Sequence, residues 1–483
     1  MSEVTRSFRR QGIDFLGFLQ AKLRDLQEPS ILVSELVQNA DDAPGVTKLL
    51  FDVRDDGLWV WNNGSFRDTD FDRMQNVATG GKREEENTTG AFGIGFIAVY
   101  QITDHPELFS AGRHWIFRPE EPEEKRILEE VGENRSDTGF WLPWATDPQT
   151  QVRQQLRLPP ISEDTVERFA NDLNTVLPNT LLFVRKLEDI ELRRNGTPLK
   201  RTERVLGEKE LLVHDGNATQ LFHLFEGGFA AEARHLRTLF DNRIETKRSD
   251  RVVVAIPADP ADHEGPLYAF LPTQDRTGMT VHVNADFFTS SDRKHVLFDD
   301  GYQGQWNRNA ILAASRAVGA ALNCLPQLVG HGPFWKLIAS MEATSGRANS
   351  GEVDRSFAEF WNQVEPRLSS ADVVYTSTGL WRKPSTTLLL ESEDEEQALE
   401  VLEALKLEIV HPDLRTRHNL LRRRSVGVQI LSARDEREIL ADIGLKHNHR
   451  RIEERKREDR AGNCCPNRKR GCEWQRRHSK SCA

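Results

Sequence analysis

The chain has 483 residues, of which 38% are hydrophobic and 29% are charged, and its formal net charge is −10. This length predicts several domains, and this composition is typical of a soluble globular protein. No run approaches the roughly 18 apolar residues that cross a membrane, and the N-terminus lacks the apolar core of a secretion signal. We therefore expect a cytoplasmic protein without a membrane span.

The charge is unevenly distributed along the chain. Residues 446–483 carry 13 Lys and Arg against 5 Asp and Glu, a net charge of +8, which leaves −18 for the rest. Such an acidic body disfavours nucleic acid as a partner. This tail also holds four of the five cysteines, without the paired CxxC spacing of zinc modules. We predict that it is disordered; electrostatic binding to an acidic partner and a reading frame lost near residue 446 are the alternatives.

The hydrophobic periodicity and the turn residues predict a first domain over residues 1–195. Helices are expected at 11–26, 30–43 and 163–176, and strands at 48–53, 58–61, 114–117, 138–142 and 181–184. A polar, mobile loop is expected at 65–90, followed by a loop that enters a helix at 91–103. This order of helices and strands indicates an α+β fold, a two-layer sandwich.

Three further regions follow. A smaller α/β domain is predicted over 196–330, with strands at 251–256 and 280–283 and a helix at 307–322. Residues 331–445 are predicted as a mixed α/β region, and 446–483 as the basic tail.

The segment Glu35–Ala43, ELVQNADDA, carries the most informative motif. On a helix, Glu35, Asn39 and Asp42 fall within roughly 60° of one another, and apolar residues occupy the opposite face. An amide oxygen suits Mg²⁺, and a carboxylate can orient or deprotonate a water molecule. The alternative is an ordinary amphipathic helix with a solvated polar face.

A glycine-rich segment follows at Gly90–Phe96, GAFGIGF. Glycines let backbone amides approach a polyphosphate, and a following helix N-terminus favours negative charge. The preceding residues, KREEENTTG, do not read as the strand that a dinucleotide fingerprint requires, and no GxxxxGK[ST] motif occurs. Between the two motifs lies LWVWNNG, a strand that ends in Asn62, Asn63 and Gly64, where a base edge can be bound.

The order and spacing of ExxxNxxDA, a strand ending before Gly, a lid-like loop and GxFGxGFxxxY resemble the Bergerat nucleotide fold of GHKL ATPases. The runs ELVQNADDA, FGIGFIAVYQITDHPELFSAG and DRTGMTVHVNADFFTSSDRKH resemble the sacsin-type branch, which is related to the N-terminal ATP-binding domain of ninety-kilodalton heat-shock chaperones. The resemblance covers residues 1–120 best and fades towards residue 425.

The resemblance implies a role for each matching residue. Glu35 would be the general base, Asn39 the Mg²⁺ ligand, and Asp42 part of the pocket wall. Asn62 and Gly64 would contact the adenine base of the nucleotide. Gly80, Gly81 and Lys82 would belong to the lid over ATP. The phosphate loop would contain Gly90, Phe92, Gly93 and Gly95, with Phe96 behind it.

Two positions need comment. Most GHKL proteins have Asp where this chain has Asn62, and an amide carbonyl can still accept a hydrogen bond from adenine but without the charge that strengthens it. In the second domain, Arg293 or Lys294 would stabilise the γ-phosphate, with Arg276 a weaker candidate. The alternative for Arg293 and Lys294 is a solvated basic loop.

The sequence therefore predicts Mg²⁺-dependent ATP binding and hydrolysis that drive conformational cycling, with protein clients and a homo-dimer as partners. The alternative is a nucleotide-gated binding or scaffold module with negligible turnover. A histidine kinase is disfavoured because we find no helix pair with a phosphoacceptor histidine, and a topoisomerase because none of the four tyrosines has a DNA-cleavage context.

Overall fold

The structure of the protein is a computed structural model that describes residues 14–24, 29–75, 96–241, 243–259, 264–290, 292–347, 351–390, 407–432 and 438–439. The chain divides into two compact units, residues 1–373 and residues 374–483. The domain boundaries that the sequence suggests near residues 195, 330 and 445 stay predictions.

The first unit contains α-helices and two short 3₁₀ helices, η2 and η3. In chain order they are α1 (Phe15–Leu23), α2 (Pro29–Asp42), α3 (Asp68–Gln75), η2 (Phe96–Gln101), η3 (Glu123–Lys125), α4 (Gln151–Leu156), α5 (Glu163–Thr180), α6 (Ala230–Leu239), α7 (Tyr302–Ala321), α8 (Leu325–Val329), α9 (His331–Gly346) and α10 (Glu352–Leu368).

The strands described in this unit form one 14-stranded mixed sheet, in the order β13-β12-β14-β11-β10-β9-β8-β7-β1-β2-β6-β3-β4-β5. They are β1 (Lys48–Val53), β2 (Gly57–Asn62), β3 (Glu107–Ser110), β4 (Arg113–Phe117), β5 (Ile127–Val131), β6 (Thr138–Pro143), β7 (Asp189–Arg194), β8 (Thr197–Leu206), β9 (Glu210–Asp215), β10 (Ala218–Gly228), β11 (Arg251–Pro257), β12 (Pro266–Ala269), β13 (Leu271–Arg276) and β14 (His282–Ala285). The parallel pairing of β1 with β7 joins the strands β1–β6 to the strands β7–β14.

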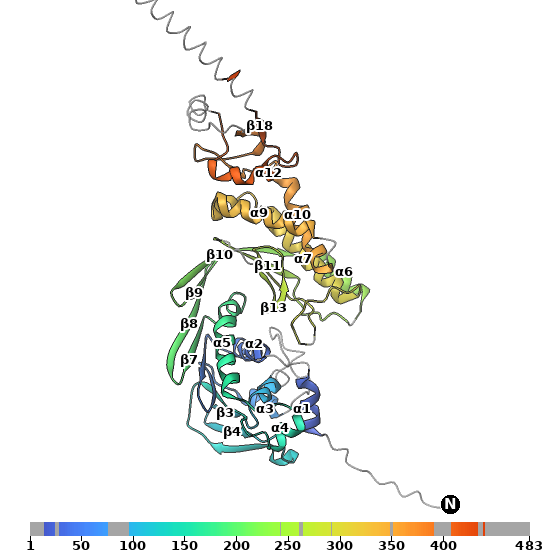
Figure 1. Ribbon diagram of the computed structural model, residues 1–483. Coiled ribbons are helices and arrows are strands. Elements are labelled where there is room, and N and C mark those ends of the chain that lie inside the picture. The colour runs from blue at the N-terminus through green and yellow to red at the C-terminus, as the bar shows by residue number, and fades with distance from the viewer. Residues whose placement is uncertain are drawn as a thin grey trace, which may run out of the picture. The chain divides into compact units, whose positions relative to one another are not determined.

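The β1–β2 hairpin shows how the sequence directs this sheet. Its turn closes where Arg54 N donates to Gly57 O at 2.9 Å, as the Asp-Asp-Gly turn predicts. Along β2 the alternation is clear, because Leu58, Val60 and Asn62 are buried while Trp59 and Trp61 are partly exposed. The buried face packs in one core with residues of α1, α2 and α5. Figure 1 shows α5 beside β7.

Helix α5 is the longest of the helices α1–α5. Ser162 is its N-cap and accepts a hydrogen bond from Thr165 N at 3.3 Å. Two acidic residues stand in the first turn, where their negative charges interact favourably with the positive end of the helix dipole. Its buried residues Val166, Phe169, Leu173 and Leu177 recur at helical spacing and enter the core.

The predicted α+β class is confirmed, and most predicted elements have a counterpart. The predicted strand at 181–184 is wrong, because this segment is a turn after α5. Its backbone groups are bound by side chains: Arg204 donates to Leu181 O at 3.3 Å and also to Val184 O. A segment whose carbonyls are satisfied in this way needs no neighbouring strand.

The predicted loop at 65–90 is wrong in part. Residues 68–75 form α3, which buries Phe71 and Met74 against the core. Residues 76–95 lie outside the described residues. The helix expected within 91–103 is η2, a 3₁₀ helix rather than an α-helix.

The remaining strand and helix predictions of the first unit fall on β11, β14 and α7. Helix α7 packs against β10 and β11, and α10 packs against α7 and α9. Trp335 on α9 is fully buried and donates its ring N–H to Val373 O at 3.0 Å.

The second unit is built from short elements, namely β15 (Val374–Tyr375), β16 (Trp381–Arg382), η4 (Pro384–Thr386), β17 (Leu388–Leu390), η5 (Pro412–Arg417), α12 (His418–Leu421) and β18 (Gln429–Leu431). Its small core contains Leu390, Ile409 and Leu431. The basic tail, with Cys464, Cys465, Cys472 and Cys482, lies outside the described residues.

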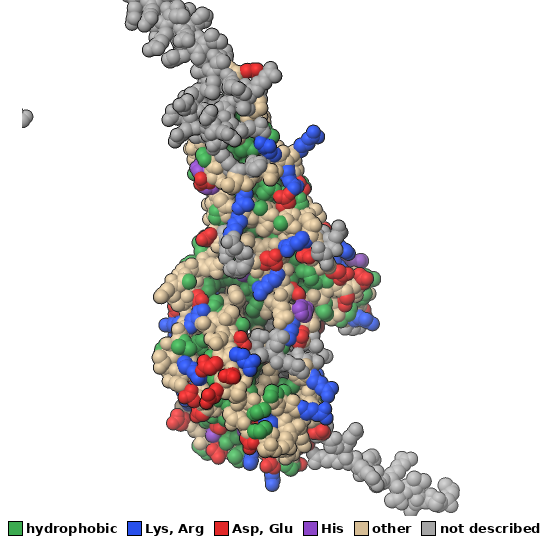
Figure 2. Space-filling model, viewed as in Figure 1, with side chains coloured by type: hydrophobic (Ala, Val, Ile, Leu, Met, Phe, Trp, Pro, Cys, Tyr) green, Lys and Arg blue, Asp and Glu red, His purple; other side chains and the backbone are tan. Residues whose placement is uncertain are grey.

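None of the helices in the described part of the chain is long and apolar enough to span a membrane. In Figure 2, Lys and Arg side chains are interspersed with Asp and Glu over the visible face. The described residues on that face form no continuous positive area of the kind that binds nucleic acid.

The close packing around Gly64 gives a first prediction. A Cβ at this position would lie 2.4 Å from Val46 Cγ2, and Val46 is fully buried with no room to move. Gly64→Ala should therefore cost about 1–3 kcal/mol of the free energy of unfolding. Gly207→Ala is the control, because its nearest contact would be 3.4 Å and its cost should stay within about 0.5 kcal/mol. Urea denaturation of both variants tests this, and equal losses would contradict it.

Candidate functional site

Helix α2 carries the first motif, and its polar side chains are buried rather than solvated. Glu35 is 8% exposed, Gln38 6% and Asp42 8%, while Asn39 is partly exposed. Burial of a carboxylate is costly unless it has a role or a partner. Glu35 and Asp42 therefore do not lie on a solvated face, and the functional roles of Glu35, Asn39 and Asp42 stay predictions.

Asp41, in the same motif, has a structural role that the sequence analysis did not assign. Its carboxylate accepts hydrogen bonds from three consecutive backbone N–H groups, those of Arg185, Lys186 and Leu187, at 2.7–3.0 Å. Lys186 also donates its Nζ to Asp42 O at 3.0 Å. These bonds fix the end of α2 against the segment that leads into β7.

Asn62 lies at the end of β2 and is buried, at 6% exposed. Its side-chain oxygen accepts from Gly64 N at 3.0 Å, which shapes the chain's exit from the strand. The predicted base-binding oxygen therefore already has one intramolecular donor, although an amide oxygen can accept a second hydrogen bond.

Two hydroxyl groups stand beside Asn62. In the sheet register Asn62 pairs with Thr138 of β6, and Thr138 pairs with Ser110 of β3, so the three side chains share the core face. The Ser110 and Thr138 hydroxyl oxygens are 2.8 Å apart, and Ser110 Oγ accepts from Phe66 N at 3.0 Å. This polar row was missed because strand pairing between distant residues leaves no local signal.

The glycine motif is represented in the described residues only by Phe96. Its ring lies 5.4 Å from that of Phe117 and 5.6 Å from that of Phe140, so it anchors the start of η2 in the core. The predicted lid residues Gly80, Gly81 and Lys82 and the predicted phosphate-loop residues Gly90, Phe92, Gly93 and Gly95 lie outside the described residues.

A tight turn from the second half of the unit presents Arg293 to α2. Arg293 has φ 57°, a left-handed conformation that side chains rarely adopt. Its Nη1 lies 3.3 Å from Glu35 Oε1 and donates to Gln38 Oε1. The structure thus brings together the predicted base and one of the two predicted basic residues. Gln38, which stands one turn from Glu35, was not assigned a role by the sequence.

Glu35 and Arg293 line a cleft of about 250 Å³ between α2, α5, β12 and β13, whereas the predicted site residues Asn39, Asp42, Asn62 and Gly64 are not part of its lining. Its walls also include the predicted residue Lys294 and the weaker candidate Arg276. Its apolar lining includes Ile31, Val176, Ala269 and Leu271. The cleft is therefore lined by anionic, cationic and apolar side chains.

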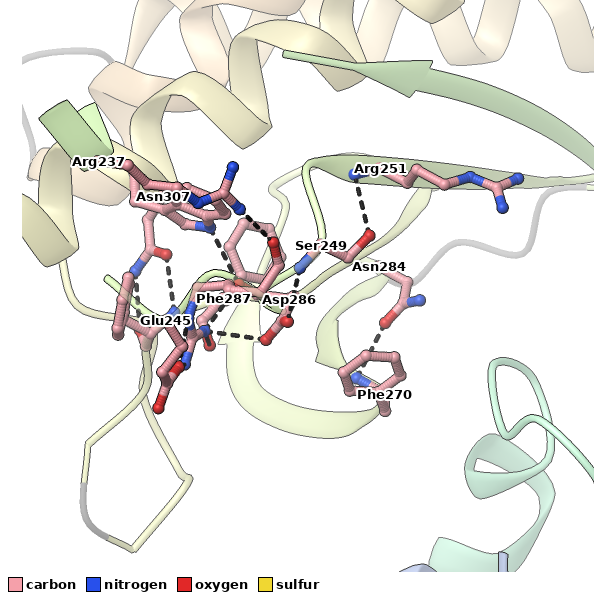
Figure 3. Close-up of polar contacts among 12 residues, drawn as sticks. Arg237, Glu245, Ser249, Arg251, Phe270, Asn284, Asp286, Phe287 and Asn307 are labelled. Carbon is pink, nitrogen blue, oxygen red and sulfur yellow. Dashed lines mark hydrogen bonds and ion pairs between the residues drawn. The ribbon is translucent and has the colours of Figure 1, made fainter. Parts of the chain in front are cut away.

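The segment that leads to this turn is held by a dense polar network (Figure 3). Arg248 donates to Asp286 Oδ1 at 2.9 Å and to Asp286 O at 3.0 Å, and Ser249 N donates to Asp286 Oδ2 at 3.0 Å. Asn307 of α7 donates to Phe288 O and accepts from Phe288 N. The bonds of Asn307 connect Phe288 to α7, and the bonds of Asp286 connect the same segment to Arg248 and Ser249, shortly before the Arg293 turn.

Asp292 shapes the turn itself. It accepts from Ser290 Oγ and from Lys294 N at 3.2 Å. Burial alone would raise the pKa of its carboxyl group. The hydrogen bonds from Ser290 and Lys294, with the positive charges of Lys294 and His295, outweigh burial and lower that pKa below its ordinary value of 3.8.

A pH dependence follows from this lowered pKa. Because the folded state favours the charged form, the contribution of Asp292 is fully present above pH 3.8 and is lost as the pH falls through the lower, folded-state pKa. Asp292→Asn should reduce the loss of stability on acidification. Unfolding free energies of both proteins between about pH 2 and pH 6 measure this, and parallel curves would show that Asp292 makes no such contribution.

The N-terminal part of this site lies in a region that is similar to known proteins. Residues 14–136 match the family model of the Sacsin domain, so this part of the chain, which holds α2, β2 and η2, is sacsin-like.

Two curated relatives are similar to the chain. Sacsin from Homo sapiens is 27% identical over 228 residues, which cover 37% of this chain and 5% of that protein. Protein NO VEIN from Arabidopsis thaliana is 25% identical over 302 residues, which cover 58% of this chain and 11% of that protein. The chain thus spans a small part of the length of either relative.

Two solved structures are also similar. The N-terminal domain of a DNA repair protein has a TM-score of 0.36 and 11% identity, over 64% of this chain and 99% of that chain. The ATPase region of Saccharomyces cerevisiae topoisomerase II bound to ICRF-187 has a TM-score of 0.25 and 11% identity, over 41% of this chain and 59% of that chain.

Proposed function

We propose that the chain binds ATP with Mg²⁺ at the buried polar face of α2 and hydrolyses it. The observation that carries this proposal is the meeting of Glu35 with Arg293. A buried carboxylate and a guanidinium from a distant part of the chain converge on the helix that also bears Asn39. The match of residues 14–136 to the Sacsin domain supports the same assignment.

The donor set suits a magnesium nucleotide. Asn39 offers a neutral oxygen on the same helix face as Glu35, and the cation would keep most of its waters there. Bound Mg²⁺ would supply charge neutralisation at the phosphate oxygens. Asp42 would complete the wall of the pocket, and Asn62 and Gly64 would contact the adenine base of the nucleotide.

The chain's own residues then have separate tasks. Glu35 would orient a water molecule and take its proton, provided that Arg293 releases its carboxylate. Arg293, with Lys294 beside it in the cleft, would stabilise negative charge on the terminal phosphate. If the Arg293 guanidinium left Glu35 and bound a phosphate group instead, nucleotide binding would be coupled to movement of the turn that carries Arg293.

A nucleotide-gated binding module with negligible turnover is the second candidate. The ion pair between Arg293 and Glu35 favours it, since a carboxylate that is occupied by a guanidinium is not available to orient a water molecule. Protein clients, a homo-dimer, a cytoplasmic location and kinship with the heat-shock chaperones belong to the same proposal and rest on the sacsin-like resemblance.

Phosphate release from ATP with Mg²⁺ separates the two candidates. Glu35→Gln should keep ATP affinity and lower turnover by about 10²–10⁴-fold, because the general base is lost. Glu167→Gln is a matched control, since Glu167 on α5 is largely exposed and pairs with Arg194, away from the cleft. Its turnover should match that of the native chain.

Three outcomes decide the matter. Turnover in the native chain that is lost in Glu35→Gln supports the ATPase. ATP binding without turnover in either protein supports the gated module. If the native chain does not bind ATP, both the ATPase and the nucleotide-gated module are wrong.

A further inference from the structure

The two outermost strands of the 14-stranded sheet, β13 and β5, differ in what lies against them. In β13, Gln274 N donates to Lys294 O at 2.8 Å, and Asp275 Oδ2 accepts from Val296 N at 2.6 Å. The segment that follows β14 therefore lies against this strand. β5 is the last strand at the other end of the sheet and pairs with β4. Within the residues that the structure describes, this second edge is open.

The backbone of β5 faces β4 and the exterior at alternate residues. Arg118 N donates to Arg126 O at 2.7 Å at one end of the pair, and Gly132 N donates to Gly112 O at 3.0 Å at the other end. The register between these two bonds is continuous, and in an antiparallel pair the bonded residues alternate with residues that are not bonded. The N–H and C=O groups that point away from β4 are therefore those of Ile127, Glu129 and Val131. They have no hydrogen-bond partner among the described residues.

The side chains of β5 are exposed as well. Val131 is 100% exposed and Leu128 is 41% exposed. The side chains of Glu129 and Glu130 are 54% and 55% exposed. Charged side chains protect an edge strand from pairing with other chains, but exposed aliphatic side chains make such pairing favourable. β5 thus combines both kinds of residue, and the charges decide which partner it accepts.

The surroundings of β5 are strongly acidic. Residues 119–133 contain seven Glu against one Lys and one Arg, a net charge of −5. Glu129 lies 3.8 Å from Arg113 Nε, and Glu130 lies 3.4 Å from His114 Nδ1. Neither carboxylate is held by a short ion pair, so both can interact with cations of a partner.

A second copy of the chain does not suit this edge. If two β5 strands paired antiparallel through their outward groups, Glu129 of one copy would lie opposite Glu129 of the other. Like charges directly opposite each other destabilise an antiparallel pair. A strand with Lys or Arg opposite Glu129 replaces this repulsion by attraction.

We propose that β5 is a docking site for an extended, basic segment of a partner protein, which pairs with β5 as a further strand of the sheet. Main-chain hydrogen bonds to Ile127, Glu129 and Val131 provide affinity, as in other cases of strand addition. Basic side chains beside Glu129 and Glu130 provide specificity, and aliphatic side chains pack on Leu128 and Val131. This site is separate from the proposed nucleotide site and does not depend on it.

A synthetic peptide with the core Val-Lys-Lys-Leu-Val is a suitable probe. Paired antiparallel with residues 131 to 127, it places its lysines opposite Glu130 and Glu129. Fluorescence anisotropy of the labelled peptide, titrated with the full chain, measures binding. The basic peptide should bind saturably, and the same peptide with Glu in place of both lysines should bind at least about tenfold more weakly. The double variant Glu129→Lys, Glu130→Lys should reverse this preference.

Val131→Pro separates main-chain pairing from charge attraction. Proline removes the outward N–H of residue 131 and leaves the bonds to β4 intact, because the neighbouring residues make them. Affinity for the basic peptide should fall by about tenfold or more. Val131→Thr is the matched control, since threonine keeps the N–H group, and its affinity should stay within about threefold of the native value. Circular dichroism of both variants verifies the fold.

The outcomes decide for or against the docking site. Equal affinities for the basic and the acidic peptide would overturn it, as would equal affinities of Val131→Pro and Val131→Thr for the basic peptide. Sedimentation velocity of the full chain tests the competing occupant. A concentration-dependent dimer that is lost in Val131→Pro would assign β5 to a second copy and overturn the proposal.

Discussion

The carboxylate of Asp41 is the constraint on which the first unit depends. By accepting from three consecutive backbone N–H groups at residues 185–187, it connects the end of α2 to the segment that enters β7. Because β7 lies parallel to β1 and continues into β8–β14, this carboxylate also fixes α2 relative to both parts of the sheet. Arg204 holds the carbonyl groups of the same turn from the side of β8. Because the end of α2 is fixed in this way, a change of contacts at the middle of the helix leaves its C-terminal end in position.

Arg293 acts on that middle. Its turn is shaped by Asp292, and the segment before it is fixed to α7 through Asn307, so the guanidinium reaches Glu35 from a rigid support. Any group that competes with Glu35 for Arg293 therefore changes a contact between α2 and the segment that connects β14 to α7. Signals of this kind need a contact with two alternative partners, and an ion pair partly open to water supplies one. The exposed fraction of the Arg293 side chain, 42%, leaves it accessible to such a competitor.

What the sequence predicted, and what it missed, follows from the range of the interactions. Helices α1, α2, α5 and α7 and the β1–β2 hairpin carry periodicity and turn residues within a few positions, so they were predictable. The segment 181–184 looked like a strand because Leu181, Leu182, Phe183 and Val184 are all apolar. Its carbonyl groups are instead bound by Arg204, which lies 23 residues from Leu181 and 20 residues from Val184 along the chain. Thr138 and Ser110 likewise depend on strand pairings that no local pattern encodes.

The distribution of buried polar groups on α2 supports the proposed nucleotide site. Helix α2 has 14 residues, and Glu35, Gln38, Asp41 and Asp42 are all buried on it. Asp41 is explained by the chain connection it makes, since its three backbone donors compensate for its burial. Glu35 and Gln38 gain one guanidinium between them, which a pair of apolar residues could replace without loss of stability. Sequences depart from the rules of stable packing mainly at functional sites. Glu35, to which the proposed nucleotide site assigns a role, and Gln38, which shares its guanidinium partner, are thus the buried residues of α2 that stability does not explain.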